Sequence, residues 1–298
     1  MKVLLLTDPM PAAVFQEALS ATAGVKLLPY HLNLCDAELA DVEAVLAWQV
    51  PEGVYSRLPR LRWVCSVAAG VEKLLTNDLP AEVPVSRIVD VEQAEGIAQF
   101  VVMMALRHAR NLPRYEAQQL QRQWVRQPVA AVRSRVSVLG MGTMGSAIAR
   151  LLSAVGFEVT HWNSRSSLSL EDVLSQSDIT VCALPLTPQT QGILNAQTLA
   201  WLPRGAYLIN VARGGHVVEA DLIAAVRSQH LSGAALDVQR CEPMPADDAL
   251  WAVPGITITP HIGAQSSVHT IAAQFAQGLD ALRTGSALPR LVNRAAGY

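Results

Sequence analysis

Apolar residues recur along the chain in short runs, and each run is followed by a segment typical of a helix or a turn. The first series of runs, rich in Val, Ile and Leu, comprises Val3–Thr7, Val25–Leu28, Ala44–Trp48, Arg62–Val67 and Val85–Val89. The second begins at Arg135 and continues through Glu158–Trp162, Ile179–Leu184, Ala206–Val211, Gly233–Val238 and Ile256–Pro260. Such alternation indicates repeated βα units, and strands that are apolar throughout are typical of parallel sheets covered on both faces. We therefore predict an α/β fold of two doubly wound, Rossmann-like domains with parallel sheets.

Three longer stretches outside the two series are expected to be helical: Gln93–Arg110, Pro113–Trp124 and Ala264–Arg283. The first two lie between the series and the third follows the second series, so the chain can cross from one domain to the other and return. We expect residues 1–98 and 268–298 to form one domain and residues 99–267 the other, with the active site in the cleft between them.

Composition and charge exclude several classes of protein. Half of the residues are apolar (51%), and the formal net charge is −2 without a basic run that would neutralise a series of phosphates, so no nucleic acid partner is expected. The start of the chain, Met1–Pro9, has too short an apolar run for a signal peptide. The most apolar stretch elsewhere, Ile97–Leu106, is about half the length needed to cross a bilayer, so no membrane span is expected.

The cysteines indicate a reducing environment. They lie far apart and without CxxC spacing, at Cys35, Cys65, Cys182 and Cys241. In a chain of this length the pattern favours free thiols, and we expect a cytoplasmic protein with no metal site.

A glycine-rich loop follows the first strand of the second series. The strand Arg135–Leu139 leads into the GxGxxG sequence Gly140-Met141-Gly142-Thr143-Met144-Gly145, and a helix-like segment, Ser146–Val155, follows without a break. In this setting the first glycine permits a tight turn, the second a close approach to a pyrophosphate, and the third the packing of helix on strand. GxGxxG alone is a weak signal, but between strand and helix it predicts a dinucleotide site formed by residues 140–145.

The end of the next strand indicates which dinucleotide binds. Dinucleotide-binding domains that prefer NAD carry an acid about 20 residues after the glycine loop, where it binds the ribose hydroxyls. Here the sequence is Trp162-Asn163-Ser164-Arg165-Ser166, which has no carboxylate. We expect Asn163, Ser164, Arg165 and Ser166 to bind a 2′-phosphate, which favours NADPH, with NADH as the weaker alternative. The alternative interpretation of Arg165 is a solvated loop arginine.

Three later segments place polar residues just past apolar strands, where open α/β sheets bind ligands. They are Ile209–Gly215, Ala235–Val238 continuing to Cys241–Pro243, and Thr259–Ala264. Taken singly, each has an ordinary explanation: Arg213 as a surface cation, Glu242 as a loop acid, and His261 as a helix-capping imidazole.

Together, downstream of the glycine loop, these segments resemble the D-isomer-specific 2-hydroxyacid dehydrogenase family. The resemblance covers nearly the whole chain and includes the turn Val67–Lys73, which looks like the family's carboxylate-binding turn. Ala47-Trp48, the missing acid after the second cofactor strand, and the ending Asn293–Tyr298 resemble the family's glyoxylate/hydroxypyruvate reductase A branch. The turn departs from many relatives in two ways. Many relatives have a further glycine earlier in the turn, where this chain has Ala68-Ala69 before Gly70. The acidic residue that often follows the position of Val71 is present here only as Glu72.

The resemblance implies a function for each domain and for particular residues. The first domain is then a flavodoxin-like substrate-binding domain and the second the dinucleotide-binding Rossmann domain. Arg213, Glu242 and His261 are implied as catalytic residues, and Asp237 as the group that orients the nicotinamide carboxamide. Further residues implied to contact the cofactor are Leu184, Pro185, Leu186, Thr190, Val211, Ala212, Arg213, His261 and Gly263. Those implied to contact the substrate are Trp48, Ala69, Gly70, Val71, Arg213 and His261, although a buried tryptophan that ends a strand is more often plain core.

The residue types fit this chemistry independently of the family. Reduction of a ketone by hydride places negative charge on the carbonyl oxygen, so the site needs a proton donor and a fixed cation. His261 can donate near neutral pH, and a carboxylate beside an imidazole, here that of Glu242, favours its protonated form. The planar guanidinium of Arg213 can hold the carboxylate and carbonyl oxygens of the substrate. We therefore expect NADPH-dependent reduction of a small 2-oxo acid such as glyoxylate or hydroxypyruvate.

Several alternatives stay open. Within the family, a reductase of bulkier 2-oxo acids is the nearest rival. A phosphoglycerate dehydrogenase is disfavoured because the chain leaves no room for a regulatory domain, and a formate dehydrogenase because such enzymes carry glutamine where Glu242 stands. From another class, a non-catalytic NAD(H)-sensing module like the family's corepressors can keep the same three residues. A homodimer is expected from the resemblance, with 93–124 as its interface.

Overall fold

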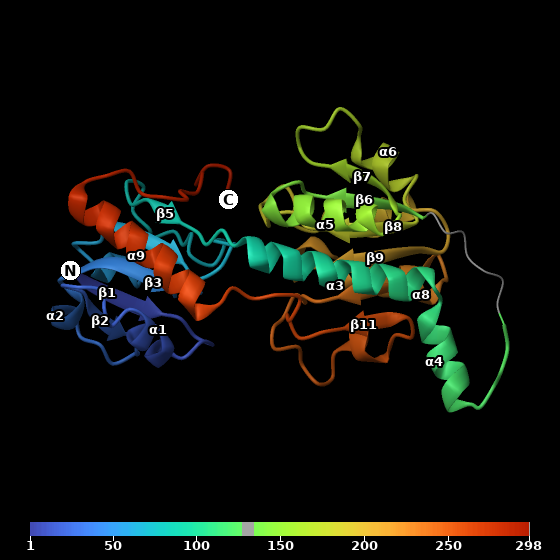
Figure 1. The fold of residues 1–298 in the computed structure, drawn as a ribbon, viewed down its shortest axis with the longest axis horizontal. Helices are drawn as coiled ribbons and strands as arrows, with labels where there is room; N and C mark the ends of the chain where they lie inside the picture. Colours follow the sequence, from blue (N-terminus) through green and yellow to red (C-terminus); the bar gives the residue numbers. More distant parts are fainter. Residues whose placement is uncertain (127–133, 298) are drawn as a thin grey trace. The chain divides into compact units, whose positions relative to one another are not determined.

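The computed structural model describes residues 1–126 and 134–297, and the chain divides into two compact units, Met1–Asp90 with Ser266–Tyr298 and Val91–Gln265 (Figure 1). The division expected from the sequence at 98/99 falls inside helix α3 (Val91–Ala109), which lies whole in the second unit. The reason is that its buried residues, Ala98 and Val101 among them, all pack in the core of that unit. Of the ending Asn293–Tyr298 compared above, Tyr298 lies outside the described residues.

The first unit is built on a five-stranded parallel sheet in the order β2-β1-β3-β4-β5. Its strands are β1 (Lys2–Leu6), β2 (Lys26–Pro29), β3 (Val42–Ala47), β4 (Trp63–Ser66) and β5 (Val85–Ser86). Its helices are α1 (Ala12–Ala18), α2 (Asp36–Leu39), the 3-10 turn η1 (Tyr55–Arg57) and α9 (Val268–Thr284). This strand order is the flavodoxin-like one. Helix α9 comes from the far end of the sequence, so the C-terminal segment completes this unit.

Alternating residues of the strands cover the two faces of this sheet. Val3 and Leu5 of β1 pack with Phe275 of α9 in one core, whereas Leu4 and Leu6 of the same strand belong to the core on the opposite face. All four residues are buried, so the continuous apolar run follows from burial on both faces.

The second unit carries a six-stranded parallel sheet in the order β11-β10-β9-β8-β6-β7. Its strands are β6 (Arg135–Leu139), β7 (Glu158–Trp162), β8 (Ile179–Cys182), β9 (Ala206–Asn210), β10 (Leu231–Leu236) and β11 (Ile256–Ile258). Its helices are α3, α4 (Leu112–Leu120), α5 (Thr143–Ala154), α6 (Leu170–Leu174), α7 (Ala196–Ala200) and α8 (Glu219–Arg227), with 3-10 turns η2 (Gly214–His216) and η3 (Ala249–Ala252). The prediction of two doubly wound domains with parallel sheets is confirmed.

Helices cover both faces of this second sheet. Helices α3 and α5 lie side by side on one face (Figure 1), where they share a core with residues such as Val136 and Ile179. The opposite core contains Leu139 and Leu208 together with Leu222 of α8. Strand order reverses between β6 and β8, and ligands of such sheets bind at this switch point, beyond the carboxyl ends of the strands.

The predicted elements exist, but several of their ends were misplaced. Helix α9 begins at Val268 and not at Ala264, because the hydroxyl of Ser267 accepts a hydrogen bond from the Thr270 amide and caps the helix. The fifth strand ends at Ser86, three residues before the predicted end at Val89. No helix within residues 1–126 and 134–297 is long and apolar enough to cross a bilayer.

Candidate active site

The three residues predicted to be catalytic follow three neighbouring strands of the second sheet. Arg213 comes after β9, Glu242 after β10 and His261 after β11, and these strands lie next to each other in the order β11-β10-β9. Because the strands are parallel, their carboxyl ends lie at one edge of the sheet, and all three residues belong to the loops at that edge.

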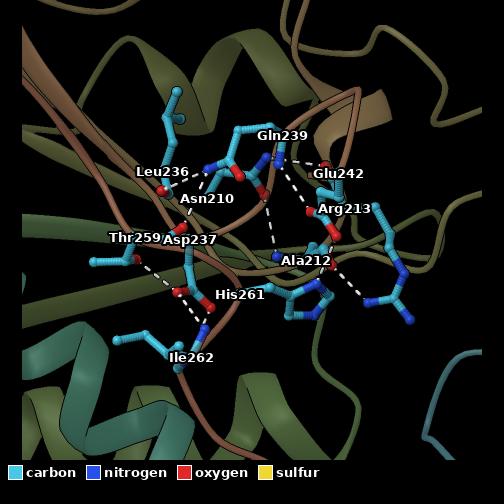
Figure 2. Close-up of polar contacts among 11 residues, drawn as sticks. Asn210, Ala212, Arg213, Leu236, Asp237, Gln239, Glu242, Thr259, His261 and Ile262 are labelled. Atoms are coloured by element: carbon cyan, nitrogen blue, oxygen red, sulfur yellow. Dashed lines mark hydrogen bonds and ion pairs between the residues drawn. The ribbon is translucent and has the colours of Figure 1, made fainter. Parts of the chain in front are cut away.

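His261 and Glu242 form a hydrogen-bonded pair. The imidazole Nδ1 of His261 lies 2.8 Å from Oε2 of Glu242, and the two side chains are 30% and 28% exposed (Figure 2). The other carboxylate oxygen, Oε1, accepts a hydrogen bond from the backbone amide of Gln239 at 3.0 Å. The carboxylate is therefore held on one side while it faces the imidazole on the other.

Asp237 fixes the loop that carries His261. Its carboxylate is buried and accepts three hydrogen bonds, from the Thr259 hydroxyl (2.6 Å) and from the amides of Ile262 (2.9 Å) and Gly263 (2.8 Å). His261 itself adopts a left-handed backbone conformation, φ +54°, which a non-glycine residue adopts only at some cost. The bonds to Asp237 on both sides of this residue offset that cost. Sequence analysis assigned Asp237 to the nicotinamide, and that role stays a prediction.

The loop of Arg213 is fixed by a buried asparagine at the end of β9. Asn210 accepts from the Ala212 amide at 3.1 Å and donates to the Arg213 carbonyl at 2.9 Å. The guanidinium of Arg213 donates through Nη1 to the Ala212 carbonyl at 2.7 Å. Gly214 follows directly after Arg213, and its backbone packs against that of Gln239: a Cβ at this position would lie only 1.9 Å from the carbonyl carbon of Gln239. The loops after β9 and β10 are therefore in backbone contact. This contact brings the loop of Arg213 against the loop that supports Glu242.

Sequence analysis gave no role to several of these supporting residues. Asn210, Gln239 and Thr259 hold the loops, and His216 lies buried within η2. The side-chain amide of Gln239 donates to the carbonyls of Leu236 (3.0 Å) and Thr259 (3.3 Å). For Asn210, Gln239 and Thr259 one signal in the sequence pointed to a role, namely a polar residue at or just past the end of a strand that is apolar elsewhere, whereas His216 lies six residues past β9 and has no such signal.

The glycine loop has the geometry that a dinucleotide requires. Gly140 has φ +99°, and a Cβ on Gly145 would lie 1.8 Å from the carbonyl oxygen of Gly140, so helix α5 can pack this closely only with glycine there. A Cβ on Gly142 would meet nothing within 4 Å, which leaves open space beside the first turn of α5. The backbone of residues 140–145 therefore fits a pyrophosphate at the N-terminus of a 12-residue helix.

The loop after β7 forms a compact turn with an exposed arginine. Asn163 accepts from the Arg165 amide at 2.9 Å, and the Ser166 hydroxyl accepts from the Asn163 amide at 2.9 Å. Ser164 and Arg165 are exposed. The amide of Gly140 donates to the Trp162 carbonyl at 2.7 Å, so this turn adjoins the glycine loop.

The remaining residues predicted to contact the cofactor lie in loops at the same edge. Leu184, Pro185 and Leu186 follow β8, and this loop is closed by the Thr190 hydroxyl, which donates to the Pro185 carbonyl at 2.7 Å. Three more residues lie in the loops already described: Val211, Ala212 and Gly263.

The residues predicted to bind the substrate belong partly to the first unit. Trp48 follows β3, and the turn with Ala69, Gly70 and Val71 follows β4, the neighbouring strand. The Ser66 hydroxyl shapes this turn by accepting from the Ala68 amide at 3.0 Å and donating to the Gly70 carbonyl at 2.8 Å. Trp48 is half-buried, and the ammonium of Lys73 lies 5.2 Å from the centre of its ring.

Comparison with known proteins agrees with this geometry. The family model of the NAD-binding domain of D-isomer specific 2-hydroxyacid dehydrogenases matches residues 102–263. A glyoxylate/hydroxypyruvate reductase A of Serratia proteamaculans is 35% identical over 272 residues, which cover 85% of this chain and 87% of the relative.

Solved structures give the same result. A D-isomer specific 2-hydroxyacid dehydrogenase from Xanthobacter autotrophicus Py2, in complex with NADPH and MES, has a TM-score of 0.89 at 35% identity and covers 100% of this chain and 99% of its own. An NADPH-dependent glyoxylate/hydroxypyruvate reductase from Sinorhizobium meliloti, in complex with NADP and sulfate, has a TM-score of 0.91 at 30% identity, with coverage of 100% and 99%. The chain therefore belongs to the D-isomer-specific 2-hydroxyacid dehydrogenase family and is an NAD(P)-dependent oxidoreductase.

Proposed function

We propose that this protein uses NADPH to reduce small 2-oxo acids, glyoxylate to glycolate and hydroxypyruvate to glycerate. The observation that carries the proposal is the His261–Glu242 pair, with Nδ1 and Oε2 2.8 Å apart, on loops beside that of Arg213. A proton donor and a cation at one edge of a dinucleotide-binding sheet are what reduction of a ketone requires.

His261 donates the proton that the reduced carbonyl oxygen needs. Since Nδ1 faces Glu242, the proton delivered to the substrate is the one on Nε2. The carboxylate of Glu242 stabilises the imidazolium before the transfer, and the Gln239 amide keeps that carboxylate in place. In the reverse oxidation His261 accepts the proton again.

Arg213 binds and orients the substrate. Its guanidinium holds the carboxylate and the carbonyl oxygen of the 2-oxo acid, and the bond from Nη1 to the Ala212 carbonyl limits its rotation. The amides of Gly70 and Val71, with Ala69, bind the substrate carboxylate in the first unit. Trp48 limits the size of the group attached to the carbonyl carbon, so the substrate is small.

NADPH supplies the hydride when it is bound. Residues Gly140–Gly145 hold its pyrophosphate, and Arg165, with Asn163, Ser164 and Ser166, holds the 2′-phosphate. Leu184, Pro185, Leu186, Thr190, Val211, Ala212 and Gly263 line the rest of the cofactor site, and Asp237 orients the carboxamide. The exposed guanidinium of Arg165 and the lack of a carboxylate in this turn support NADPH over NADH. The relatives from Xanthobacter and Sinorhizobium were solved with NADPH and NADP.

The protein also forms a homodimer through residues 93–124, which include most of α3, all of α4 and the residues just after it. Large apolar side chains are exposed along this segment, with Met103 at 52%, Leu120 at 88% and Trp124 at 92%. An apolar surface of this kind is typical of an interface and is unusual for a monomer. The cytoplasm stays the expected compartment from the cysteine pattern.

The test follows NADPH absorbance with micromolar protein and a panel of 2-oxo acids, each repeated with NADH. We expect consumption with glyoxylate and hydroxypyruvate, faster with NADPH than with NADH. Faster reduction of larger 2-oxo acids would favour the bulkier-substrate alternative. Tight NADPH binding without consumption in the whole panel would favour the sensing module and contradict an enzymatic role for His261.

A further inference from the structure

His216 is a buried histidine that the proposed mechanism does not use. It lies in η2, three residues after Arg213, and is completely inaccessible to solvent. Its Nδ1 lies 3.0 Å from the carbonyl oxygen of Arg213, and its Nε2 lies 3.2 Å from the carbonyl oxygen of Pro185. The ring therefore spans the loop after β9 and the loop after β8.

The contacts of this ring indicate its protonation state. A carbonyl oxygen can only accept a hydrogen bond, so each ring nitrogen that bonds a carbonyl must carry a proton. A neutral imidazole carries one N–H, and its other nitrogen would place a lone pair against a carbonyl oxygen in a site without water access. Both contacts of His216 are hydrogen bonds only when the ring is the doubly protonated imidazolium.

The surroundings of the ring favour the charged form. Burial by itself disfavours the charge, but the interaction with the Cys182 side chain at the end of β8 and the hydrogen bonds to the carbonyls of Pro185 and Arg213 outweigh it and raise the pKa of His216 above the ordinary histidine value. Cys182 is the titratable group that acts on the ring. The segment 183–192 contains no ionisable residue, and the guanidinium of Arg213 is directed to the Ala212 carbonyl.

The position of the ring connects two parts of the proposed site. Backbone bonds already join the far ends of the two loops, from Gly192 to the Gly215 carbonyl (2.8 Å) and from Leu194 to the His216 carbonyl (2.9 Å). The imidazole adds a bond nearer the reacting groups, between Pro185 and Arg213. Loss of one ring proton would remove one of these two bonds and uncouple the loops at that point.

We propose that His216 is a positioning residue that, as an imidazolium, ties the loop of the substrate-binding Arg213 to the loop 184–190 of the cofactor site. This inference rests on the proposed function for its effect on catalysis. The charge on the ring is a property of the folded chain and is testable without substrate. Deprotonation at alkaline pH then weakens substrate binding through Arg213.

The first experiment measures the ring nitrogens of His216 by NMR in the wild-type protein labelled with ¹⁵N-histidine. We expect both nitrogens to be protonated at neutral pH and to lose a proton only well above the range of an ordinary histidine. His230 is an internal control, because one of its nitrogens contacts a single carbonyl, that of Leu199 at 3.0 Å. A single neutral tautomer of His216 at neutral pH would overturn the inference, and this measurement needs no variant that might misfold.

The second experiment compares kcat and KM across pH for wild type, His216→Gln and the control His230→Gln. Glutamine places a donor group at only one of the two ring-nitrogen positions and an acceptor oxygen at the other, so we expect KM for the 2-oxo acid to rise about tenfold or more at neutral pH with a smaller change in kcat. The wild-type KM should rise toward the variant's value at alkaline pH, while that of the variant stays flat there. An alkaline rise of the same size in His216→Gln would contradict the role of the ring.

The two failures are distinguishable. If wild type consumes no NADPH with any 2-oxo acid, the proposed function fails and the NMR titration still decides the charge of His216. If wild type is active and His216→Gln matches it at every pH, the positioning role fails and the proposed function stands.

Discussion

The substitution Glu242→Gln isolates the charge that Glu242 presents to His261, because glutamine keeps the size of the side chain. The Gln239 amide needs an acceptor at the position of Oε1, so the oxygen of the new amide must face Gln239 and its NH₂ group must face Nδ1 of His261. An NH₂ group donates, so Nδ1 becomes an acceptor and the ring is held neutral with its proton on Nε2. In the variant, the proton donor to the substrate is therefore a neutral imidazole, which is a weaker acid than the imidazolium of the wild type.

The size of the effect follows from the geometry of the pair. A full charge at about 4 Å contributes about 4 kcal/mol near a protein surface. With both side chains close to 30% exposed, solvent screening reduces this figure. We take a remaining contribution of about 1 to 3 kcal/mol, which corresponds to a loss in kcat of roughly five- to 150-fold.

The assay is steady-state reduction of glyoxylate at saturating NADPH, together with the dissociation constant of NADPH. Glu219→Gln is a matched control, because Glu219, at the start of α8, also accepts from a backbone amide of the Glu242 loop, that of Arg240 at 3.0 Å. We expect kcat to fall in Glu242→Gln alone and NADPH binding to stay within about twofold in both variants. Unchanged turnover in Glu242→Gln, or an equal loss in Glu219→Gln, would exclude a catalytic role for the charge of Glu242.

Three other perturbations test separate parts of the molecule. Arg165→Ala should weaken NADPH binding by about tenfold or more and leave NADH binding nearly unchanged, and an unaltered preference in titrations would remove Arg165 from the 2′-phosphate site. Trp48→Ala should raise the relative kcat/KM for longer 2-oxo acids, whereas a fall in thermal stability with no change in selectivity would assign Trp48 to the core. Burial lowers the pKa of His108, stacked on Tyr207 with ring centres 4.2 Å apart, to about 4. The unfolded chain protonates this group near pH 6.5, so its stabilising effect is present above that pH and is lost as pH falls toward 4. In His108→Phe, the drop in the free energy of unfolding between about pH 7 and pH 4 should be smaller than in wild type by up to about 3 kcal/mol, as measured by denaturant titration. The same pH dependence in the variant and wild type would contradict this role of His108.

The sequence predicted well those features that depend on local pattern. The βα alternation is local because a strand buried on both faces is apolar throughout, as in Val3–Leu6. The glycine loop is largely local as well, since Gly140 and Gly145 meet within one turn, although a Cβ on Gly140 would also lie 2.5 Å from the Ala183 carbonyl oxygen beyond β8.

Features that depend on contacts between distant segments were not predictable in the same way. The three hydrogen bonds to Asp237 come from residues at least 22 positions away, so they depend on the pairing of β10 with β11. The ring of His216 reaches Pro185 across 31 positions for the same kind of reason, here because β8 pairs with β9. The apolar face of α3 fitted either domain by composition, and its packing against α5 and β9 assigns the whole helix to the second unit.

Whether His261 is the proton donor of a 2-oxo acid reductase is decided by measuring glyoxylate turnover and NADPH binding in His261→Ala beside wild type. We expect rapid NADPH oxidation by wild type, a loss of at least about a hundredfold in kcat for the variant, and a nearly unchanged dissociation constant for NADPH. Equal turnover by the two proteins would contradict it.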